Sequence, residues 1–216
     1  MKEPMAVTAE VGQDSDKRQR LLDAALHEFA RFGFDGGRLE RIAAEAGCAK
    51  RMLYYYFGNK EDVYLAVLER AYDDIRASED VLHLDALPPR EALHALARQS
   101  FFYHQNNADF TRLVLQENFQ EGTMLNALPG AERLREAAFA PLRRILDRGA
   151  EAGIFRAGIE AVDVHFLISA ISSFRVDHAY SWKNMLQIDL LAEPVMSRHL
   201  TLLLAQLDAL TGYRKD

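Results

Sequence analysis

Apolar residues recur every three or four positions near the start of the chain, which predicts two amphipathic helices there. The first stripe comprises Leu22, Ala25, Leu26, Phe29 and Phe32, and the second comprises Leu39, Ile42, Ala43 and Ala46. Residues 14–16 offer N-cap side chains before the first helix. Gly33 and Gly47 follow the two stripes, where a helix end favours glycine. A third, short helix is expected over residues 50–57, anchored by Leu53 and Phe57.

The rest of the chain also has a helical pattern. A helix is expected from Lys60 to about Ala77, and further helical stretches cover residues 89–106, 108–122, 129–153, 163–185 and 193–211. Gly and Pro separate them, and no alternating run bounded by hairpin turns appears. The pattern predicts an all-α protein. It predicts a disordered tail over residues 1–14, a first domain of three helices over 15–60, and a larger helical domain over 61–216.

Two short helices joined by residues 46–49 are typical of a helix-turn-helix, whose second helix enters the major groove. If Leu53 and Phe57 face the core, then Arg51, Met52 and Tyr55 face outwards. The remaining candidates for DNA contact are Lys50 at the helix start, the flanking Tyr54 and Tyr56, and Lys60 at the start of the next helix. Basic side chains can donate hydrogen bonds to guanine, and tyrosine hydroxyls can donate to phosphate. Packing of the three tyrosines in a core is the alternative.

Residues 20–68 read RLLDAALHEFARFGFDGGRLERIAAEAGCAKRMLYYYFGNKEDVYLAVL, and this segment resembles the TetR family. The resemblance implies a ligand-responsive, dimeric repressor. It makes residues 15–60 the helix-turn-helix DNA-binding domain and residues 61–216 the helical ligand-binding and dimerisation domain. It places Lys50, Arg51 and Tyr54 near bases, and Tyr55, Tyr56 and Lys60 near the DNA backbone. Gly37 occupies the position of a hydroxyl residue that caps the second helix and touches phosphate. Ala49 replaces a frequent capping serine, and Tyr56 replaces a usual histidine.

The charge distribution and the cysteine content limit which partners and which kinds of site the chain can have. The chain carries a net charge of −6, but residues 15–60 hold nine Lys/Arg against six Asp/Glu, a local excess of +3. A basic head on an acidic body suits a protein that presents one end to DNA. The single cysteine, Cys48, excludes a disulfide framework and a multi-cysteine zinc site. It is expected to be a buried turn residue, with a redox sensor as the alternative. No signal peptide or membrane span is evident, so a cytoplasmic protein is expected.

The region after residue 60 shows no catalytic motif, and its histidines lack metal-ligand spacing, so no cofactor and no metal are expected. Polar residues lie among aromatic ones in two stretches, which suggests a pocket for a small organic effector. The candidate contacts are Phe102, Gln116, Glu117, Asn118, Arg175 and His178. The alternative is that these side chains point to solvent or join helices. The segment from residue 109 also resembles the branch of the pyrimidine-catabolism regulator.

The last two long helices carry broad apolar surfaces, which are expected to form a homodimer. The seam comprises Leu200, Leu203, Leu204 and Leu207 on one helix and Phe166, Ile168, Ile171 and Phe174 on the other. In the resembled family these helices form an intersubunit four-helix bundle, and a two-fold dimer would read a pseudo-palindromic DNA site. Two alternatives remain at this point, a helical enzyme carrying a helix-turn-helix and a DNA-binding architectural protein without an effector.

Overall fold

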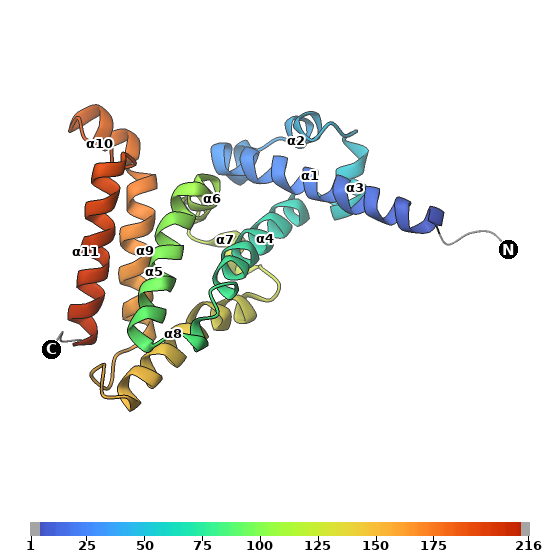
Figure 1. The fold of residues 1–216 in the computed structure, drawn as a ribbon. Helices are drawn as coiled ribbons and strands as arrows, with labels where there is room; N and C mark the ends of the chain where they lie inside the picture. Colours follow the sequence, from blue (N-terminus) through green and yellow to red (C-terminus); the bar gives the residue numbers. More distant parts are fainter. Residues whose placement is uncertain (1–4, 213–216) are drawn as a thin grey trace. The chain divides into compact units, whose positions relative to one another are not determined.

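The computed structural model describes the backbone of residues 5–212 and the side chains of residues 14–212. Within this range the chain is helical and contains no strand, so the all-α prediction is confirmed (Figure 1). The chain divides into two compact units. The first comprises residues 1–71 and 112–129, and the second comprises residues 72–111 and 130–216. No described helix is long and apolar enough to cross a bilayer.

The first unit contains the three helices predicted near the start of the chain. Its elements are α1 (Met5–Gly36), α2 (Leu39–Glu45), α3 (Arg51–Phe57), the first part of α4 (Lys60–Asp80), the last part of α6 (Ala108–Phe119), and α7 (Thr123–Asn126). Helix α1 is already helical at Met5, within the segment expected to be a disordered tail. Residues 14–16 lie inside this helix and do not cap it, while residues 1–4 lie outside the described residues.

The predicted glycine breaks are present in the first unit. Gly33 has φ +67° and ψ −177°, so it interrupts α1 where the first stripe ends. Gly47 has φ +63°, in the region that glycine adopts without a Cβ clash, and it ends α2. The core beneath the three helices is made of fully buried side chains that include Phe29, Ile42 and Leu53. The Tyr64 ring from α4 packs edge-to-face against Phe29, with the ring centroids 4.8 Å apart.

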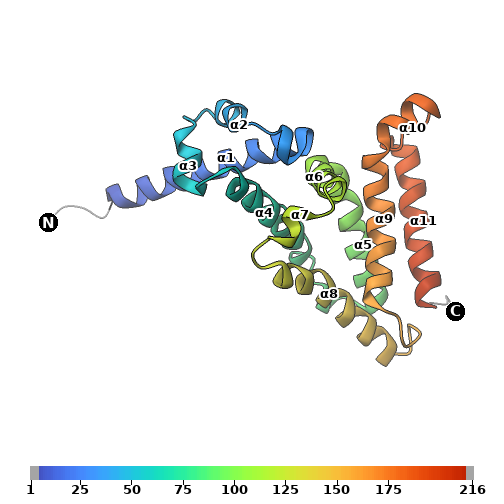
Figure 2. The same cartoon turned by 180° about the vertical axis from the view of Figure 1, so that it is seen from behind.

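The second unit is a helical bundle. Its elements are the end of α4, the 3-10 helix η1 (Leu84–Ala86), α5 (Pro89–Asn106), the start of α6, α8 (Ala131–Glu151), α9 (Ala161–Asp177), α10 (Ala179–Met185) and α11 (Glu193–Thr211). Helices α5, α9 and α11 run alongside one another in both views (Figures 1 and 2). Their shared core includes Phe101, Val164 and Leu203. Pro89 occupies the first turn of α5, where its missing N–H costs nothing.

Two sequence predictions for this unit need correction. The helix expected over residues 163–185 is two helices, since the backbone of His178 (φ −104°, ψ 5°) leaves helical geometry between α9 and α10. The seam expected to join two subunits lies largely within one chain, because Ile168, Leu203 and Leu207 are at most 3% exposed in the unit's own core. Each helix of the bundle buries one apolar stripe against the other helices of its own chain. The spacing of apolar residues does not show which stripe faces the chain's own core and which faces a second subunit.

Candidate nucleic-acid interface

Helix α3 presents the outward face that its helical spacing predicted. Leu53 is 1% exposed and anchors the helix, whereas Tyr55 is 72% exposed and Tyr54 is 48% exposed. Arg51 is also exposed, and Met52 is half-buried beside it. A short helix held by one buried leucine therefore offers a guanidinium and two phenol groups to solvent, the donor types that read bases and phosphates.

Lys50, the residue before α3, is held by α2 in this structure. Its Nζ lies 2.6 Å from Oε1 of Glu40 and 5.5 Å from the centre of the Tyr54 ring. The hydrogen bond with the Glu40 carboxylate raises the pKa of Lys50 above its ordinary value and lowers that of Glu40. To contact a base, the Lys50 ammonium group would therefore have to leave the Glu40 carboxylate and donate to the base instead.

The Tyr56 hydroxyl is tied to α1, because it donates a hydrogen bond to the Asp14 carboxylate. This bond raises the pKa of Tyr56 to about 12, so the phenol remains protonated at neutral pH. A phosphate contact by Tyr56 would have to displace Asp14. By contrast, Tyr55 lies beside it with most of its surface in solvent, with the two ring centroids 5.0 Å apart.

The start of α4 is closed by a reciprocal pair of side chains. The Asn59 Oδ1 accepts from the Asp62 amide at 3.0 Å, and Asp62 Oδ2 accepts from the Asn59 amide at 3.2 Å. This is the geometry of a capping box. Lys60 reaches back to the first helix, where its Nζ donates to the Asp35 carbonyl at 3.3 Å and lies 4.8 Å from the centre of the Phe34 ring. The ammonium group is thereby positioned beside the helix start.

A buried carboxylate that the sequence reading missed fixes α2 against α1. Glu28 is 5% exposed, and its Oε1 accepts from the Arg38 amide at 2.8 Å and from Arg41 Nε at 2.7 Å. Arg41 also donates to the Gly36 carbonyl at 2.9 Å. Arg38 is the N-cap of α2 and makes no side-chain cap of its own, so Glu28 serves this helix start from another helix. The available clue was an acidic residue three positions after Ala25 on the apolar stripe.

Gly37 packs closely against the core of the first unit. It is buried, its amide donates to the Gly33 carbonyl at 3.1 Å, and an added Cβ would lie 2.5 Å from Phe29 Cδ1. A residue with a side chain does not fit there without movement of the core. The contact of Gly37 with DNA stays a prediction. Cys48 is half-buried in the turn between α2 and α3.

Three of the six candidate ligand contacts belong to the first unit. Glu117 is fully buried; its Oε2 accepts from the Leu125 amide at 3.1 Å, and its Oε1 has no hydrogen-bond partner. Asn118 is exposed and donates to the Val114 carbonyl of its own helix at 2.8 Å. Gln116 is half-buried, with its amide group beside Gly33.

The other three candidates belong to the second unit and differ sharply in burial. Phe102 is 39% exposed, and His178 is exposed and stacked on Phe174 with the ring centroids 3.9 Å apart. Arg175 is 2% exposed. Its Cζ lies 3.5 Å from the centre of the Phe101 ring, and its Nη2 donates to Oε1 of Gln105 at 2.5 Å. Burial lowers the pKa of Arg175 to about 10.

Two further polar pairs lie inside the second unit. His104 Nδ1 lies 2.9 Å from the Thr111 hydroxyl, and burial lowers the pKa of His104 to about 4, with further contributions from Arg76 and Arg175. Arg76 Nη1 donates to Glu79 Oε2 at 2.7 Å. Burial nevertheless raises the pKa of Glu79 to about 7. Because its pKa is about 4, the His104 ring is neutral at physiological pH.

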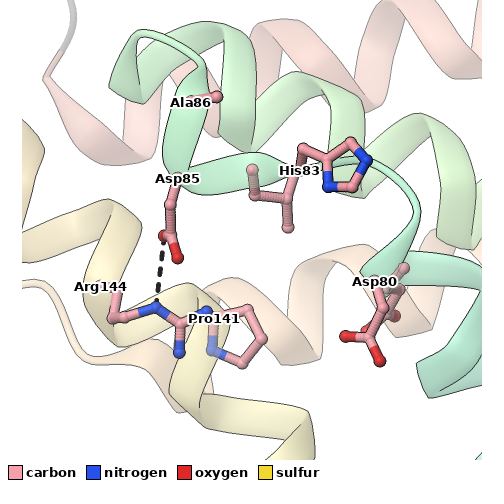
Figure 3. Close-up of a pocket in the computed structure, with 8 residues that line it drawn as sticks. Asp80, His83, Asp85, Ala86, Pro141 and Arg144 are labelled. Atoms are coloured by element: carbon pink, nitrogen blue, oxygen red, sulfur yellow. Dashed lines mark hydrogen bonds and ion pairs between the residues drawn. The ribbon is translucent and has the colours of Figure 1, made fainter.

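A surface hollow of about 360 Å³ lies between η1 and α8 (Figure 3). Asp80, His83 and Asp85 line one side and Pro141 and Arg144 the other, and the Arg144 Nε donates to Asp85 Oδ1 at 3.3 Å. Its charged rim is unlike the mostly apolar lining of a small-molecule site. Among the described residues no cluster of His, Cys, Asp or Glu has the arrangement of a metal site.

Comparison with known proteins defines the class to which this fold and face belong. The family profile "Bacterial regulatory proteins, tetR family" matches residues 21–67, and "Tetracyclin repressor-like, C-terminal domain" matches residues 89–205. The chain therefore belongs to the TetR family of helix-turn-helix transcriptional regulators, as its N-terminal segment indicated.

Among curated relatives, the transcriptional repressor NicS of Pseudomonas putida is 31% identical over 82% of this chain and 84% of its own length. The regulator RutR of Escherichia coli is 32% identical over 73% of this chain and 71% of its own length. The crystal structure of regulator SCO4942 from Streptomyces coelicolor has a TM-score of 0.68 at 24% identity, over 92% of this chain and 99% of that one. The last likeness confirms the fold.

Proposed function

We propose that this protein is a repressor that binds a pseudo-palindromic operator as a homodimer and is released by a small organic effector. The observation that carries the DNA-binding role is α3, which buries Leu53 and exposes Arg51 and Tyr55 on its opposite face. Repression is supported by the relatives NicS and SCO4008, both named as transcriptional repressors. The chain acts by binding rather than catalysis, in the cytoplasm where the chromosome lies.

On the proposed interface, Lys50 and Arg51 reach base edges with Met52 and Tyr54 beside them, while Tyr55, Tyr56 and Lys60 contact the backbone. Purified protein should select one palindromic sequence from a random DNA pool. Arg51→Ala should lower affinity for that sequence by about 1–3 kcal/mol and relax its preference, whereas Tyr55→Phe should weaken binding to all duplexes alike. Arg98→Ala, which removes an exposed arginine of α5, is the control. If Arg51→Ala leaves affinity and preference unchanged, the docking face is wrong.

The proposed dimer surface is the apolar face that the second unit leaves in solvent. On α9 and α11, Phe166 is 72% exposed, Val162 56%, Leu202 51% and Phe174 41%. Phe166 and Phe174 belong to the seam predicted from the sequence, and they are the part of it that stays in solvent. A second copy is the fitting occupant because two recognition helices must meet two half-sites.

The dimer proposal is tested by sedimentation of charge variants. The double variant Phe166→Glu/Leu202→Glu should sediment as a folded monomer, since unpaired charge in an interface is costly. Phe119→Glu provides the matched control, because Phe119 is 75% exposed but belongs to the first unit. A native protein that sediments at 24.5 kDa would contradict the dimer.

Effector control is supported by the family and by one structural relative, regulator FadR from Bacillus subtilis, which was crystallised with stearoyl-CoA. Helix α4 starts two residues after α3 and runs to Asp80 in the second unit, so it provides a covalent route from effector to recognition helix. An effector acts only if it prefers the state that fits DNA poorly. A tenfold preference, about 1.4 kcal/mol per site, would lower operator affinity roughly a hundredfold over two sites. Operator affinity that is equal with and without a bound small molecule would refute this coupling.

A further inference from the structure

Arg175 on α9 is a buried cation with unused hydrogen-bonding capacity. The side chain is 2% exposed, yet its Nε and Nη1 have no hydrogen-bond partner among the described residues. Its Nη2 donates a hydrogen bond to the neutral side-chain amide of Gln105 on α5. Buried polar groups in folded proteins are normally hydrogen-bonded, so each exception calls for an explanation.

Arg175 forms no ion pair with an acidic side chain among the described residues. Desolvation is the whole cause of its lowered pKa, with no contribution from an acidic neighbour. The titratable groups that respond to its charge are His104 on α5 and His199 on α11, and in both cases the effect favours the neutral ring. The other nearby charged residue, Arg76, already pairs with Glu79. Arg175 is therefore a buried cation without an ion-pair partner among the described residues.

We propose that Arg175 binds a carboxylate of the small-molecule effector, and that Gln105 and Phe101 orient its guanidinium group for this purpose. Phe101 covers one face of the guanidinium, so the ligand reaches its edge. Each unpartnered nitrogen adjoins Nη2, which has two hydrogens and gives one to Gln105. Gln105 takes one hydrogen of Nη2, so the other Nη2 hydrogen lies on a single edge of the guanidinium, beside either Nε or Nη1. A carboxylate can take two parallel hydrogen bonds from that edge, the geometry for which arginine is suited.

This inference rests on the proposed effector-controlled function and deepens it, because it assigns the chemical class of the effector. A carboxylate is favoured over a neutral ligand since only an anion neutralises the buried charge. The arrangement also explains why a costly unpaired cation is retained beside apolar core side chains such as Phe101.

The test measures binding of acetate, hexanoate and benzoate to the full-length protein by calorimetry, each against its uncharged amide, with inorganic phosphate in parallel. At least one carboxylate should bind saturably. The affinity of the corresponding amide should be lower by a factor of roughly 30 or more. Arg175→Met should abolish this difference, while Arg98→Met should retain it. Binding by none of the three, equal binding of acid and amide, or binding of phosphate alone would overturn the assignment.

Thermal melting without ligand gives a second readout that separates a ligand-binding role from a structural one. Arg175→Met should melt at the same temperature as the native protein or higher, because it removes a buried charge without an acidic partner. A marked drop in melting temperature would show that Arg175 stabilises the fold and would contradict the proposal. The proposed function is tested separately by operator release, so an effector that releases DNA without a carboxylate would refute only the role of Arg175.

Discussion

Replacement of Glu28 by Gln should destabilise the helix-turn-helix. The Glu28 carboxylate accepts hydrogen bonds from the Arg38 amide and from Arg41 while only 5% exposed. Glutamine has nearly the same shape, but it offers one acceptor oxygen, and its NH2 group would face the donors of Arg41. The variant therefore removes the charge and one acceptor without leaving a cavity.

The magnitude follows from the burial of the two partners. Loss of one member of a fully buried ion pair costs about 3–5 kcal/mol. The Arg41 side chain, however, is 41% exposed, so water can satisfy part of the guanidinium after the change. Hydrogen bonds to charged groups contribute about 1.5–3 kcal/mol each. We therefore expect a loss of about 2 kcal/mol, or a drop in Tm of about 4–8 °C for a chain of this size.

The measurement is thermal unfolding followed by circular dichroism, with amide hydrogen exchange over α2 to localise the effect. Glu45→Gln is the matched control, since Glu45 bonds His27 at 2.8 Å across the same pair of helices but is 47% exposed. An exposed pair contributes at most about 1 kcal/mol. If both variants melt together, the Glu28 interaction is worth no more than a surface ion pair, and our account of how α2 is held is refuted.

Three further outcomes are expected. Gly37→Ala should cost about 1–3 kcal/mol in urea unfolding, because its Cβ would lie 2.5 Å from Phe29; an unchanged midpoint would mean that the ring moves freely. Leu203→Ala should cost about 2–5 kcal/mol in the same assay, since the side chain is fully buried within one chain; a loss below 1 kcal/mol would contradict that placement. For His104, the pKa in the folded protein is about 4, below the ordinary value of 6.5. As the pH falls, the unfolded chain therefore binds a proton before the folded one does. The free energy of unfolding should fall by up to about 3 kcal/mol as the pH drops from 6.5 to 4. Urea midpoints across this range should vary less for His104→Gln, and parallel profiles would exclude His104 as the source.

Much of the fold is encoded locally and was predictable. The breaks at Gly33 and Gly47 and the start of α5 at Pro89 each depend on the conformational range of a single residue. The exposed face of α3 follows from the position of Leu53 alone, because the helical period then places its neighbours.

The features that were missed depend on partners distant in sequence. The break at His178 has no glycine or proline to mark it, and the apolar pattern continues across it. Leu202 and Leu203 are chemically identical neighbours, and only the packing of α11 decides that one is half-exposed and the other buried. The pairing of Glu28 with Arg41 spans thirteen positions, so neither residue alone indicated it.

The pairing of Glu28 with Arg38 and Arg41 limits how far the DNA-reading segment can be treated as a module. A chimaera that transfers residues 38–57 into another scaffold would carry the recognition face but leave behind the carboxylate that accepts the Arg38 amide. The recipient would then need an acid at the equivalent position of its own first helix. Redesign of DNA specificity in this protein is therefore best confined to the outward residues of α3, with the first two helices kept as a unit.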